Sequence, residues 1–273
     1  INEKKVAFEP YGYNNFFIQP DNLVNNSDNI IKLIARNSDQ PNSRWYSGTG
    51  IYRNVNMYIM QKEHILLNGI KIKTLDYKQP EIHISVQTNV GGNVVVEIVD
   101  NEKIICTEEL VSDGNVQFYL QLPGAKLWSV DNPYMYKCRI YFEGDCQEIM
   151  FGIRMIECNS NIGFCINGER IILRGGCIHH DNGLLGACAY AFAEERKVLL
   201  MKKNGYNAIR SAHNPWSKAL LDACDKHGML VLDEYVDMWY IHKTKYDYSP
   251  HVIKNYKHDL KSMIDKDYNH PSV

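Results

Sequence analysis

The chain has 273 residues, a formal net charge of −2 and 45% hydrophobic residues, and this length favours two or three domains. It carries no basic stripe that would neutralise a phosphate backbone, which argues against a nucleic-acid partner. No apolar run approaches the roughly 20 residues that cross a bilayer, which argues against a membrane-spanning protein.

Strand-like runs dominate the chain as far as about residue 160. They are rich in β-branched and aromatic residues, and turn signals such as Asn89–Asn93 and Glu143–Asp145 separate them. Glu81–Thr88 alternates apolar and polar residues, as a half-buried antiparallel strand does. The spacing of the runs predicts β-sandwiches. The expected strands are Ile30–Ala35, Gly50–Met60, Glu81–Thr88, Val94–Val99, Val116–Leu122 and Tyr134–Phe142.

Strands alternate with helices in the remainder of the chain. The expected helix Ala193–Lys203 turns Val198, Leu199 and Met201 inward and stops at Gly205. Regular alternation with short loops predicts a parallel sheet or barrel, but three βα units cannot close a barrel of eight. We therefore expect the first part of a barrel, with an open sheet as the alternative. The other expected elements are the strands Ile171–Arg174, Ala208–Ala212 and Leu230–Glu234 and the helices Trp216–His227 and His251–Tyr268.

Eight cysteines occur without a C-x-x-C pair and without a histidine at the spacing of a zinc site. Most lie among apolar neighbours, where free cysteine behaves as a small hydrophobic residue. Reduced thiols, with disulfides as the alternative, predict a cytoplasmic protein. The chain opens at Ile1 without an initiator methionine, so we expect sequence upstream of it.

Several segments occur in an order and at spacings shared with one enzyme family. They are RWYSGTGIYRNV (Arg44–Val55), WSVDNPYMY (Trp128–Tyr136), FGIR (Phe151–Arg154), FCINGERIILRGGCIHHDNG (Phe164–Gly183), NAIRSAHNPW (Asn207–Trp216), LVLDEYVDMW (Leu230–Trp239) and DYNHPSV (Asp267–Val273). Together they resemble glycoside hydrolase family 2 of the β-galactosidase/β-glucuronidase type. The resemblance implies the end of a jelly-roll sugar-binding domain in residues 1–61, an immunoglobulin-like β-sandwich in residues 62–157, and the N-terminal part of a TIM (β/α)8 barrel in residues 158–273.

The resemblance also implies a reaction. Members of this family hydrolyse terminal β-glycosides by double displacement with retention, using two carboxylates roughly 5 Å apart. In the family both glutamates follow the segment that DYNHPSV resembles, so we expect both beyond Val273 and predict that residues 1–273 alone are inactive. A β-galactoside is the expected carbohydrate substrate, with β-glucuronidase or β-mannosidase activity as alternatives. A non-catalytic carbohydrate-binding sandwich module is the alternative from another class, and a homo-oligomer is possible.

Two histidines are candidate sugar ligands because loops after barrel strands build the active-site face. His179 follows the first barrel strand, and its second ring nitrogen is expected to be held by Asp181. His180 points to the other side if the segment is extended. His213 matches the second substrate-binding histidine of the family, and Asn214, which follows it, is also expected to contact the substrate.

Charged residues at the next strand ends are expected to support the site. Arg210 lies within an apolar strand and therefore needs a carboxylate partner; in the family such an arginine orients the catalytic carboxylates. Asp233 and Glu234 cannot face one substrate together, because adjacent strand residues point to opposite sides. We expect one of them to pair with Arg210 or a histidine, and the other to be a support.

The remaining candidates lie in loops. Asp237 and Trp239 are expected to line the sugar site, and Arg44 and Trp45 either border it or are structural. The segment Ile51–Arg53 is expected in a strand core and interface. Some relatives bind magnesium through a Glu and a His just after the third strand, and Val236–Tyr240 lacks that pair. We therefore expect no cofactor and no metal, with magnesium in the full-length protein as the alternative.

Overall fold

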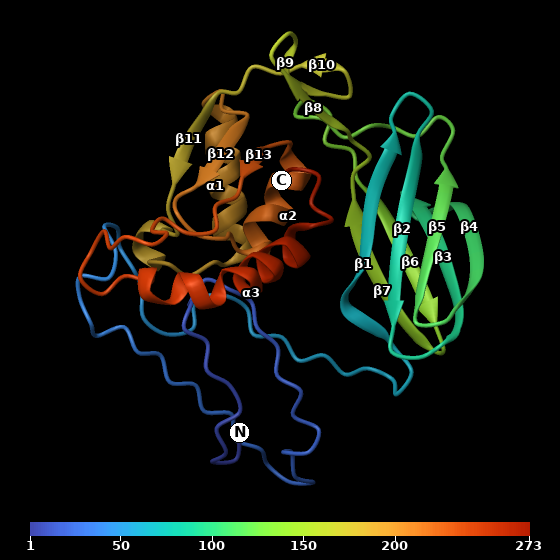
Figure 1. The fold of residues 1–273 in the computed structure, drawn as a ribbon. Helices are drawn as coiled ribbons and strands as arrows, with labels where there is room; N and C mark the ends of the chain where they lie inside the picture. Colours follow the sequence, from blue (N-terminus) through green and yellow to red (C-terminus); the bar gives the residue numbers. More distant parts are fainter.

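The computed structural model describes all residues, 1–273. Figure 1 shows three parts: extended N-terminal segments, a β-sandwich, and a layer of parallel strands with helices. None of the helices combines the length and apolarity that a bilayer crossing requires. All eight cysteines are unpaired, as the absence of paired motifs predicts.

Seven strands form the sandwich. One sheet has the order β1-β2-β5 and the other the order β4-β3-β6-β7, with antiparallel neighbours throughout. Alternate side chains of each inner face enter one core, which includes Ile84, Val96, Phe118 and Ile140. The strands are β1 (Ile65–Asp76), β2 (Glu81–Thr88), β3 (Gly92–Asp100), β4 (Lys103–Ser112), β5 (Asn115–Gln121), β6 (Tyr136–Phe142) and β7 (Asp145–Phe151).

The sequence pattern predicted β2, β3, β5 and β6 but missed the outer strands β1, β4 and β7. An irregularity in the ladder between Ile65 and Ile70 breaks the alternation of β1, and Asn68 within it adopts a φ of 57°. Most of β4 is exposed because it lies at the edge of its sheet, so no apolar face is visible in its sequence. A small sheet of β8 (Ile156–Asn159), β9 (Gly163–Ile166) and β10 (Glu169–Arg170) follows the sandwich.

Parallel strands and helices make up the last part. The sheet has the order β11-β12-β13, and α1 and α2 pack together on it around Val198, Ile209, Trp216 and Val231. Regular βα alternation was therefore predicted correctly. The elements are β11 (Gly175–Ile178), the 3-10 turn η1 (Gly183–Leu185), α1 (Ala191–Lys203), β12 (Ala208–Ser211), α2 (Lys218–His227), β13 (Leu230–Leu232) and α3 (Ser249–Asp267).

The first parallel strand is displaced from its predicted position. The apolar run Ile171–Arg174 was expected to be the strand, but β11 is the segment Gly175–Ile178, which pairs with Ala208–Ser211 of β12. A Cβ on Gly175 would lie 3.1 Å from the carbonyl oxygen of Ala208. The glycine therefore permits the close approach of the two strands, and the β-branched residues before it form the connection.

One expected core residue of α1 lies outside the core. Val198 is buried and Met201 packs partly against the same cluster, but Leu199 is 46% exposed. Successive helical residues are about 100° apart, so Val198 and Leu199 cannot both face the sheet squarely.

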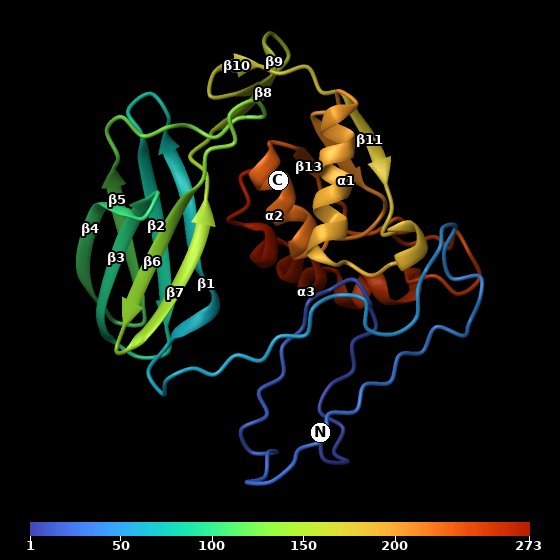
Figure 2. The ribbon, with the colours of Figure 1, turned by 180° about the vertical axis from the view of Figure 1, so that it is seen from behind.

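Residues 1–61 contain no helix or strand, so the two strands expected there, Ile30–Ala35 and Gly50–Met60, are not formed. Both runs are extended and largely exposed, and no neighbouring segment supplies a ladder of backbone hydrogen bonds to either. A β-prone sequence becomes a strand only with such a partner. In Figures 1 and 2 these blue segments run beneath α3 and along the barrel part.

Two side chains of the sandwich, the buried Trp128 and the half-buried Arg154, contribute to its contact with the barrel part. The indole Nε1 of Trp128 donates a hydrogen bond of 2.8 Å to the carbonyl oxygen of Asp225 in α2. The guanidinium of Arg154 donates to the carbonyl oxygens of Pro271 and Val273, at 2.9 and 2.5 Å. These contacts fix the last residues of the chain against the sandwich.

Candidate active site

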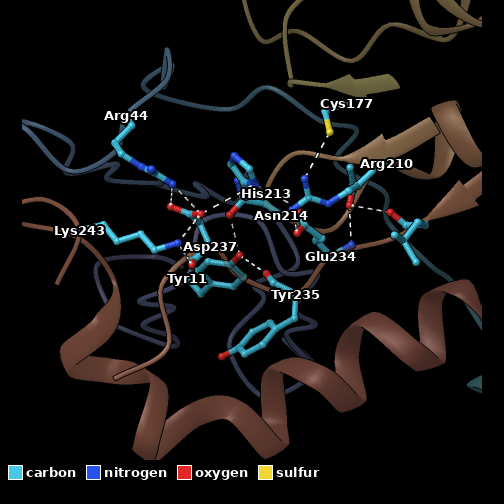
Figure 3. A network of polar contacts seen from close by, with 12 residues as sticks. Tyr11, Arg44, Cys177, Arg210, His213, Asn214, Glu234, Tyr235, Asp237 and Lys243 are labelled. Atoms are coloured by element: carbon cyan, nitrogen blue, oxygen red, sulfur yellow. Dashed lines mark hydrogen bonds and ion pairs between the residues drawn. The ribbon is translucent and has the colours of Figure 1, made fainter. Parts of the chain in front are cut away.

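Polar side chains gather where the three parallel strands end. His179 follows β11, His213 follows β12, and Glu234 and Asp237 follow β13. Carboxyl ends of parallel strands meet at one edge of a sheet, the edge that carries the active site in βα barrels. Residues far apart in sequence are thereby brought into one network (Figure 3).

Glu234 is the centre of that network. Its Oε2 atom lies 3.1 Å from Nδ1 of His213, and its Oε1 atom accepts a hydrogen bond from Arg210. Its backbone N–H donates to Oγ of Ser211 at 2.5 Å, which fixes the residue against β12. The expected carboxylate partner of Arg210 and of a histidine is therefore Glu234.

Arg210 bridges this carboxylate to β11. Its Nη1 atom donates to Sγ of Cys177, the paired residue on the neighbouring strand, at 3.3 Å. The hydrogen bonds to Cys177 and Glu234 raise the pKa of Arg210 above its ordinary value. The guanidinium is thus a fixed positive charge beside Glu234.

Asp233 points away from Glu234, as strand alternation predicts. One of its oxygens accepts the backbone N–H of Trp216 at 3.2 Å. Asp233 also lies near Asp267 at the end of α3. Burial raises the pKa of Asp267 to about 8; the charge of Lys266 opposes this rise, and the carboxylate of Asp233 adds to it. Asp233 therefore joins the end of β13 to the segment before α2, on the side away from Glu234.

Asp237 is held by two cations. Its carboxylate accepts two hydrogen bonds from Arg44, at 2.8 and 2.7 Å, and one of 2.8 Å from Lys243. Burial alone would raise the pKa of Asp237, but the bonds from Lys243 and Arg44 outweigh it and leave the pKa below its ordinary value. Its Oδ1 atom lies 3.9 Å from Nδ1 of His213, so the Asp237 group adjoins the Glu234 group.

Three rings form one wall of the site. Trp45 stacks on His179 with ring centres 5.9 Å apart and an interplanar angle of 22°. It also contacts His213, at 5.1 Å between ring centres, and the two imidazoles lie 5.5 Å apart. Of the two open interpretations, the structure places Arg44 and Trp45 at the border of the site.

His180 and Asn214 lie behind this wall in the interior. Burial, and then the positive charge of Arg53, lower the pKa of His180 well below its ordinary value, so the ring stays neutral between Tyr13 and Trp216. Asn214 is 2% exposed, and its Oδ1 atom lies 2.7 Å from the hydroxyl oxygen of Tyr11. This asparagine, expected to contact sugar, instead joins the N-terminal segment to the barrel part.

Two further expected positions differ from the structure. Asp181 was expected to hold His179, but its carboxylate accepts the N–H of Gly183 at 2.8 Å and makes no hydrogen bond to that histidine, because a local turn is nearer. Trp239 was expected to line the site, but it is 67% exposed and has no partner among the three rings of the wall.

Residues of the N-terminal segment that the sequence did not reveal complete the site. Arg53 donates to the carbonyl oxygens of Tyr13 and Pro215, at 2.8 and 2.5 Å, and so fastens two stretches of that segment behind His213. The expected interface role of Ile51–Arg53 therefore holds for Arg53, although no strand forms. Tyr11 and Lys243 also went unrecognised, because only tertiary contacts give them a role.

The groups of three side chains close enough to hold a metal ion lie elsewhere. They are Glu9, His258 and Asp259, and Asp222, Asp225 and His270. Asp259 is occupied by Asn14, Tyr235 and Tyr248, and Asp225 by His270 and Ser272. The absence of a metal at the candidate site stays a prediction.

The arrangement is suited to binding a polar ligand through hydrogen bonds. Both oxygens of Glu234 and both oxygens of Asp237 face cations or imidazole, and Asp237 with its lowered pKa is a poor proton donor. The ring nitrogen Nε2 of His213 has no partner in the structure and remains available to a ligand.

Comparison with known proteins places this site in a family. The model of the TIM barrel domain of "Glycosyl hydrolases family 2" matches residues 159–273, and the model described as "Glycosyl hydrolases family 2" matches residues 69–154. A crystal structure of a family 2 glycosyl hydrolase from Bacteroides cellulosilyticus superposes with a TM-score of 0.90 and 38% identity, over 98% of this chain and 37% of the other.

Curated relatives agree with this assignment. The chain is 34% identical to beta-galactosidase BoGH2A of Bacteroides ovatus and 30% identical to a putative beta-glucuronidase of Formosa agariphila, over its whole length in both cases. It covers 34% and 28% of these two proteins, so it spans about a third of their length. Two models of one family thus match consecutive parts of the sequence, and the sandwich and barrel portions superpose on solved members. The chain belongs to family 2 of the glycosyl hydrolases.

Proposed function

We propose that residues 1–273 are part of a longer retaining exo-β-glycosidase, and that the sugar it releases is galactose. The family assignment and the names of the relatives support a glycosidase. The observation that carries the proposal is the group formed by His213, Glu234 and Arg210 at the carboxyl ends of β12 and β13.

This group has the properties of a sugar-binding wall. A pyranose presents hydroxyl groups at its rim and C–H groups on its faces. His213 offers a free ring nitrogen to a hydroxyl, and the Trp45 ring beside it offers an apolar face to the C–H groups. Arg210 and Glu234 hold the imidazole in place.

The charges favour a neutral sugar over a uronic acid. A carboxylate on the sugar needs an uncommitted cation, and each cation of the site already has a carboxylate partner: Arg210 has Glu234, and Arg44 and Lys243 share Asp237. Another anion there would have to displace one of these pairs. We therefore propose a β-galactoside as the first substrate, ahead of a β-glucuronide, and keep a β-mannoside as a lower-ranked alternative.

Retention requires two carboxylates roughly 5 Å apart that face one anomeric carbon. Glu234 and Asp237 are both committed to cations, so we assign neither role to them. We propose that the acid/base and the nucleophile are glutamates that follow Val273 in the full-length protein. Arg210 and Glu234 then support the site by orienting His213 and contributing fixed charge.

The test uses the full-length protein with the p-nitrophenyl β-D-glycosides of galactose, glucuronic acid and mannose. We expect the highest kcat/KM for the galactoside among the three substrates. We also expect NMR spectra to show the β-anomer of the sugar as the first product. An α-anomer would refute retention, and a preference for the glucuronide would refute the argument from paired cations. Sugar binding without hydrolysis of any substrate would favour the non-catalytic carbohydrate-binding module.

A further inference from the structure

A buried polar cluster joins the last turn of α2 to residues 270–272. Asp225, His270 and Ser272 are 4%, 8% and 1% exposed. The carboxylate of Asp225 accepts hydrogen bonds from Nδ1 of His270 at 2.5 Å and from Oγ and the backbone N–H of Ser272 at 2.6 and 3.1 Å. Because α2 ends shortly before β13 begins, the cluster lies at the amino end of β13, opposite the candidate site.

Arg154 holds the same segment from the sandwich. Its Nε atom donates to the carbonyl oxygen of Pro271 at 2.9 Å, and its backbone N–H donates to Oγ1 of Thr74 in β1 at 3.1 Å. Burial lowers the pKa of Arg154, and the negative charge of Asp225 opposes this change, so the two charged groups act on one short segment. We call Arg154, Asp225, His270 and Ser272 the strand clamp.

The clamped segment lies where a fourth parallel strand would pair. The N–H of Leu230 donates to the carbonyl oxygen of Asn207, before β12, at 2.9 Å, and the N–H of Val231 donates to the carbonyl oxygen of Ser272 at 2.8 Å. Successive residues of a strand between two neighbours direct their hydrogen bonds to alternate sides. Residues 270–273 therefore adjoin the edge of β13 that β12 leaves free, and Figures 1 and 2 both show the end of the chain beside β13 and α2.

A strand that continues from this segment leads into the candidate site. Glu234 follows Val231 by three residues, which is about 10 Å along a strand. A parallel neighbour that starts at Ser272 reaches the height of Glu234 over the same length. A slip of one residue would move its side chains by about 3.3 Å and turn them to the other face of the sheet.

The position of Asp225 within α2 indicates that its role lies outside the helix. A negative charge in the last turn of a helix is disfavoured by the helix dipole, and burial of a carboxylate is unfavourable as well. All three hydrogen bonds to the Asp225 carboxylate come from His270 and Ser272. They compensate a group that helix stability alone would not place there.

We propose that the strand clamp sets the register of the strand that continues from Val273, and that Asp225 is thereby a positioning residue of the candidate site. The inference rests on the proposed function, which assigns the acid/base and the nucleophile to glutamates that follow Val273. Under that function, a glutamate on this strand meets the sugar at a height that the clamp fixes. No clamp residue touches the sugar, and the clamp acts through the strand alone.

The test uses Asp225→Ala in the full-length protein, with Ser272→Ala as a milder variant that removes one of the three hydrogen bonds. Asp222→Ala is the matched control, because Asp222 lies one turn away on α2, is exposed and pairs only with Lys218. Hydrogen exchange read by mass spectrometry should be about ten-fold faster in the peptide that follows Val273 in both clamp variants, and unchanged in β11 and β12. Asp222→Ala should exchange as the parent does.

The second measurement is kcat/KM for the aryl β-galactoside as a function of pH. A displaced carboxylate changes its distance from Arg210 and Glu234, and therefore its pKa. In Asp225→Ala we expect kcat/KM at the optimum to fall about ten- to a hundred-fold and one limb of the pH profile to move by about half a unit or more. A smaller folded fraction would lower the whole profile without moving it.

Parental exchange after Val273 in both clamp variants would overturn the proposal. Faster exchange with a pH profile that is only scaled down would also overturn it, because the clamp would then serve stability alone. If Asp225→Ala does not fold, Ser272→Ala decides by the same two measurements. If the parent hydrolyses no glycoside, the proposed function fails, and hydrogen exchange alone then supports or refutes the control of the strand by the clamp.

Discussion

Nδ1 of His213 lies 3.1 Å from Oε2 of Glu234, although 21 residues separate them in the sequence. A carboxylate oxygen accepts, so the hydrogen on the neutral imidazole is placed on Nδ1 and Nε2 is left as the free ring atom. The same carboxylate is held by Arg210, which prevents it from turning away. The orientation of the His213 ring is thus fixed before any ligand arrives.

His213→Ala in the full-length protein is expected to lower kcat/KM for the aryl β-galactoside by about two to three orders of magnitude. The reason is the loss of a hydrogen bond that strengthens in the transition state. Steady-state kinetics measure the effect, and a thermal melt checks that the protein remains folded. His83→Ala, on the outer face of the sandwich, is the matched control and should keep parental kinetics. Parental kinetics in His213→Ala would remove this residue from the site.

Residues 1–273 expressed alone should show no glycosidase activity, because the two carboxylates of the chain that lie near His213 are committed to cations. The measurement is release of nitrophenol from the aryl β-galactoside, against a preparation from cells that carry an empty vector. Turnover above that background would mean that the catalytic carboxylates lie within residues 1–273.

Gly228→Ala should destabilise the protein more than Gly205→Ala. Both glycines follow a helix and have positive φ, 68° and 84°, so alanine costs about 1 kcal/mol at either position. At Gly228 a Cβ would lie 2.3 Å from the carbonyl oxygen of Val130 in the sandwich, whereas Gly205 has open space. The overlap raises the expected loss to about 2–4 kcal/mol. Urea denaturation compares the two variants, and equal losses would mean that α2 does not pack against the sandwich.

The stability of the protein should fall as pH rises toward 9 in part because of Asp267. Burial raises the pKa of Asp267 from an ordinary value of 3.8 to about 8. A raised pKa in the folded state contributes stability that is complete below pH 3.8 and is lost as pH rises through about 8. Asp267→Asn should therefore flatten the decline in the free energy of unfolding between pH 4 and pH 9.

Asp265 provides a control of opposite sign. Burial opposes ionisation there too, but Lys261 and Lys71 outweigh it and lower the pKa of Asp265. Its contribution is present above pH 3.8 and is lost as pH falls. Asp265→Asn should therefore change the acid side of the stability profile and leave the slope between pH 6 and pH 9. The same alkaline slope in parent and Asp267→Asn would contradict the assignment.

The parallel sheet should be the point at which residues 1–273 associate or open. β11 and β13 lie at its edges, and Leu232 of β13 is 65% exposed. Ile209 and Val231 of the same sheet are buried against α1 and α2. Size-exclusion chromatography with light scattering and hydrogen exchange should reveal self-association through residues 160–273, or weaker protection there than in the sandwich. A monomer with equal protection in both parts would contradict both outcomes.

The sequence predicted those elements whose local pattern survives in the fold. Glu81–Thr88 matches β2 residue for residue, because alternation is visible wherever one face of a strand is buried. β11 was misplaced because its pairing depends on two glycines, which carry no hydrophobic signal. The strands expected in residues 1–61 failed for a related reason: pairing is a property of two segments, and the composition of one segment does not supply the other.

In the candidate site, too, the local features could be predicted from the sequence and the long-range contacts could not. The divergence of Asp233 and Glu234 follows from strand geometry, and the pairing of Arg210 follows from the cost of an unpaired charge. The contact of Arg44 with Asp237 spans 193 residues, and no local pattern announces it. The prediction that Asp181 holds His179 was wrong, because a carboxylate beside a tight turn accepts a hydrogen bond from the backbone of that turn instead.

The ion pair between Arg44 and Asp237 joins two segments that contribute different features of the site. The residues that orient His213 come from β12 and from the segment just after β13, whereas the Arg44 side chain and the Trp45 ring come from the N-terminal segment. Under the proposed function, exchanges at Arg44 and Trp45 should therefore alter which glycosides are accepted, while the residues that orient His213 stay the same. Natural or laboratory selection can therefore change substrate preference through a short surface segment, without changes to the residues of the barrel.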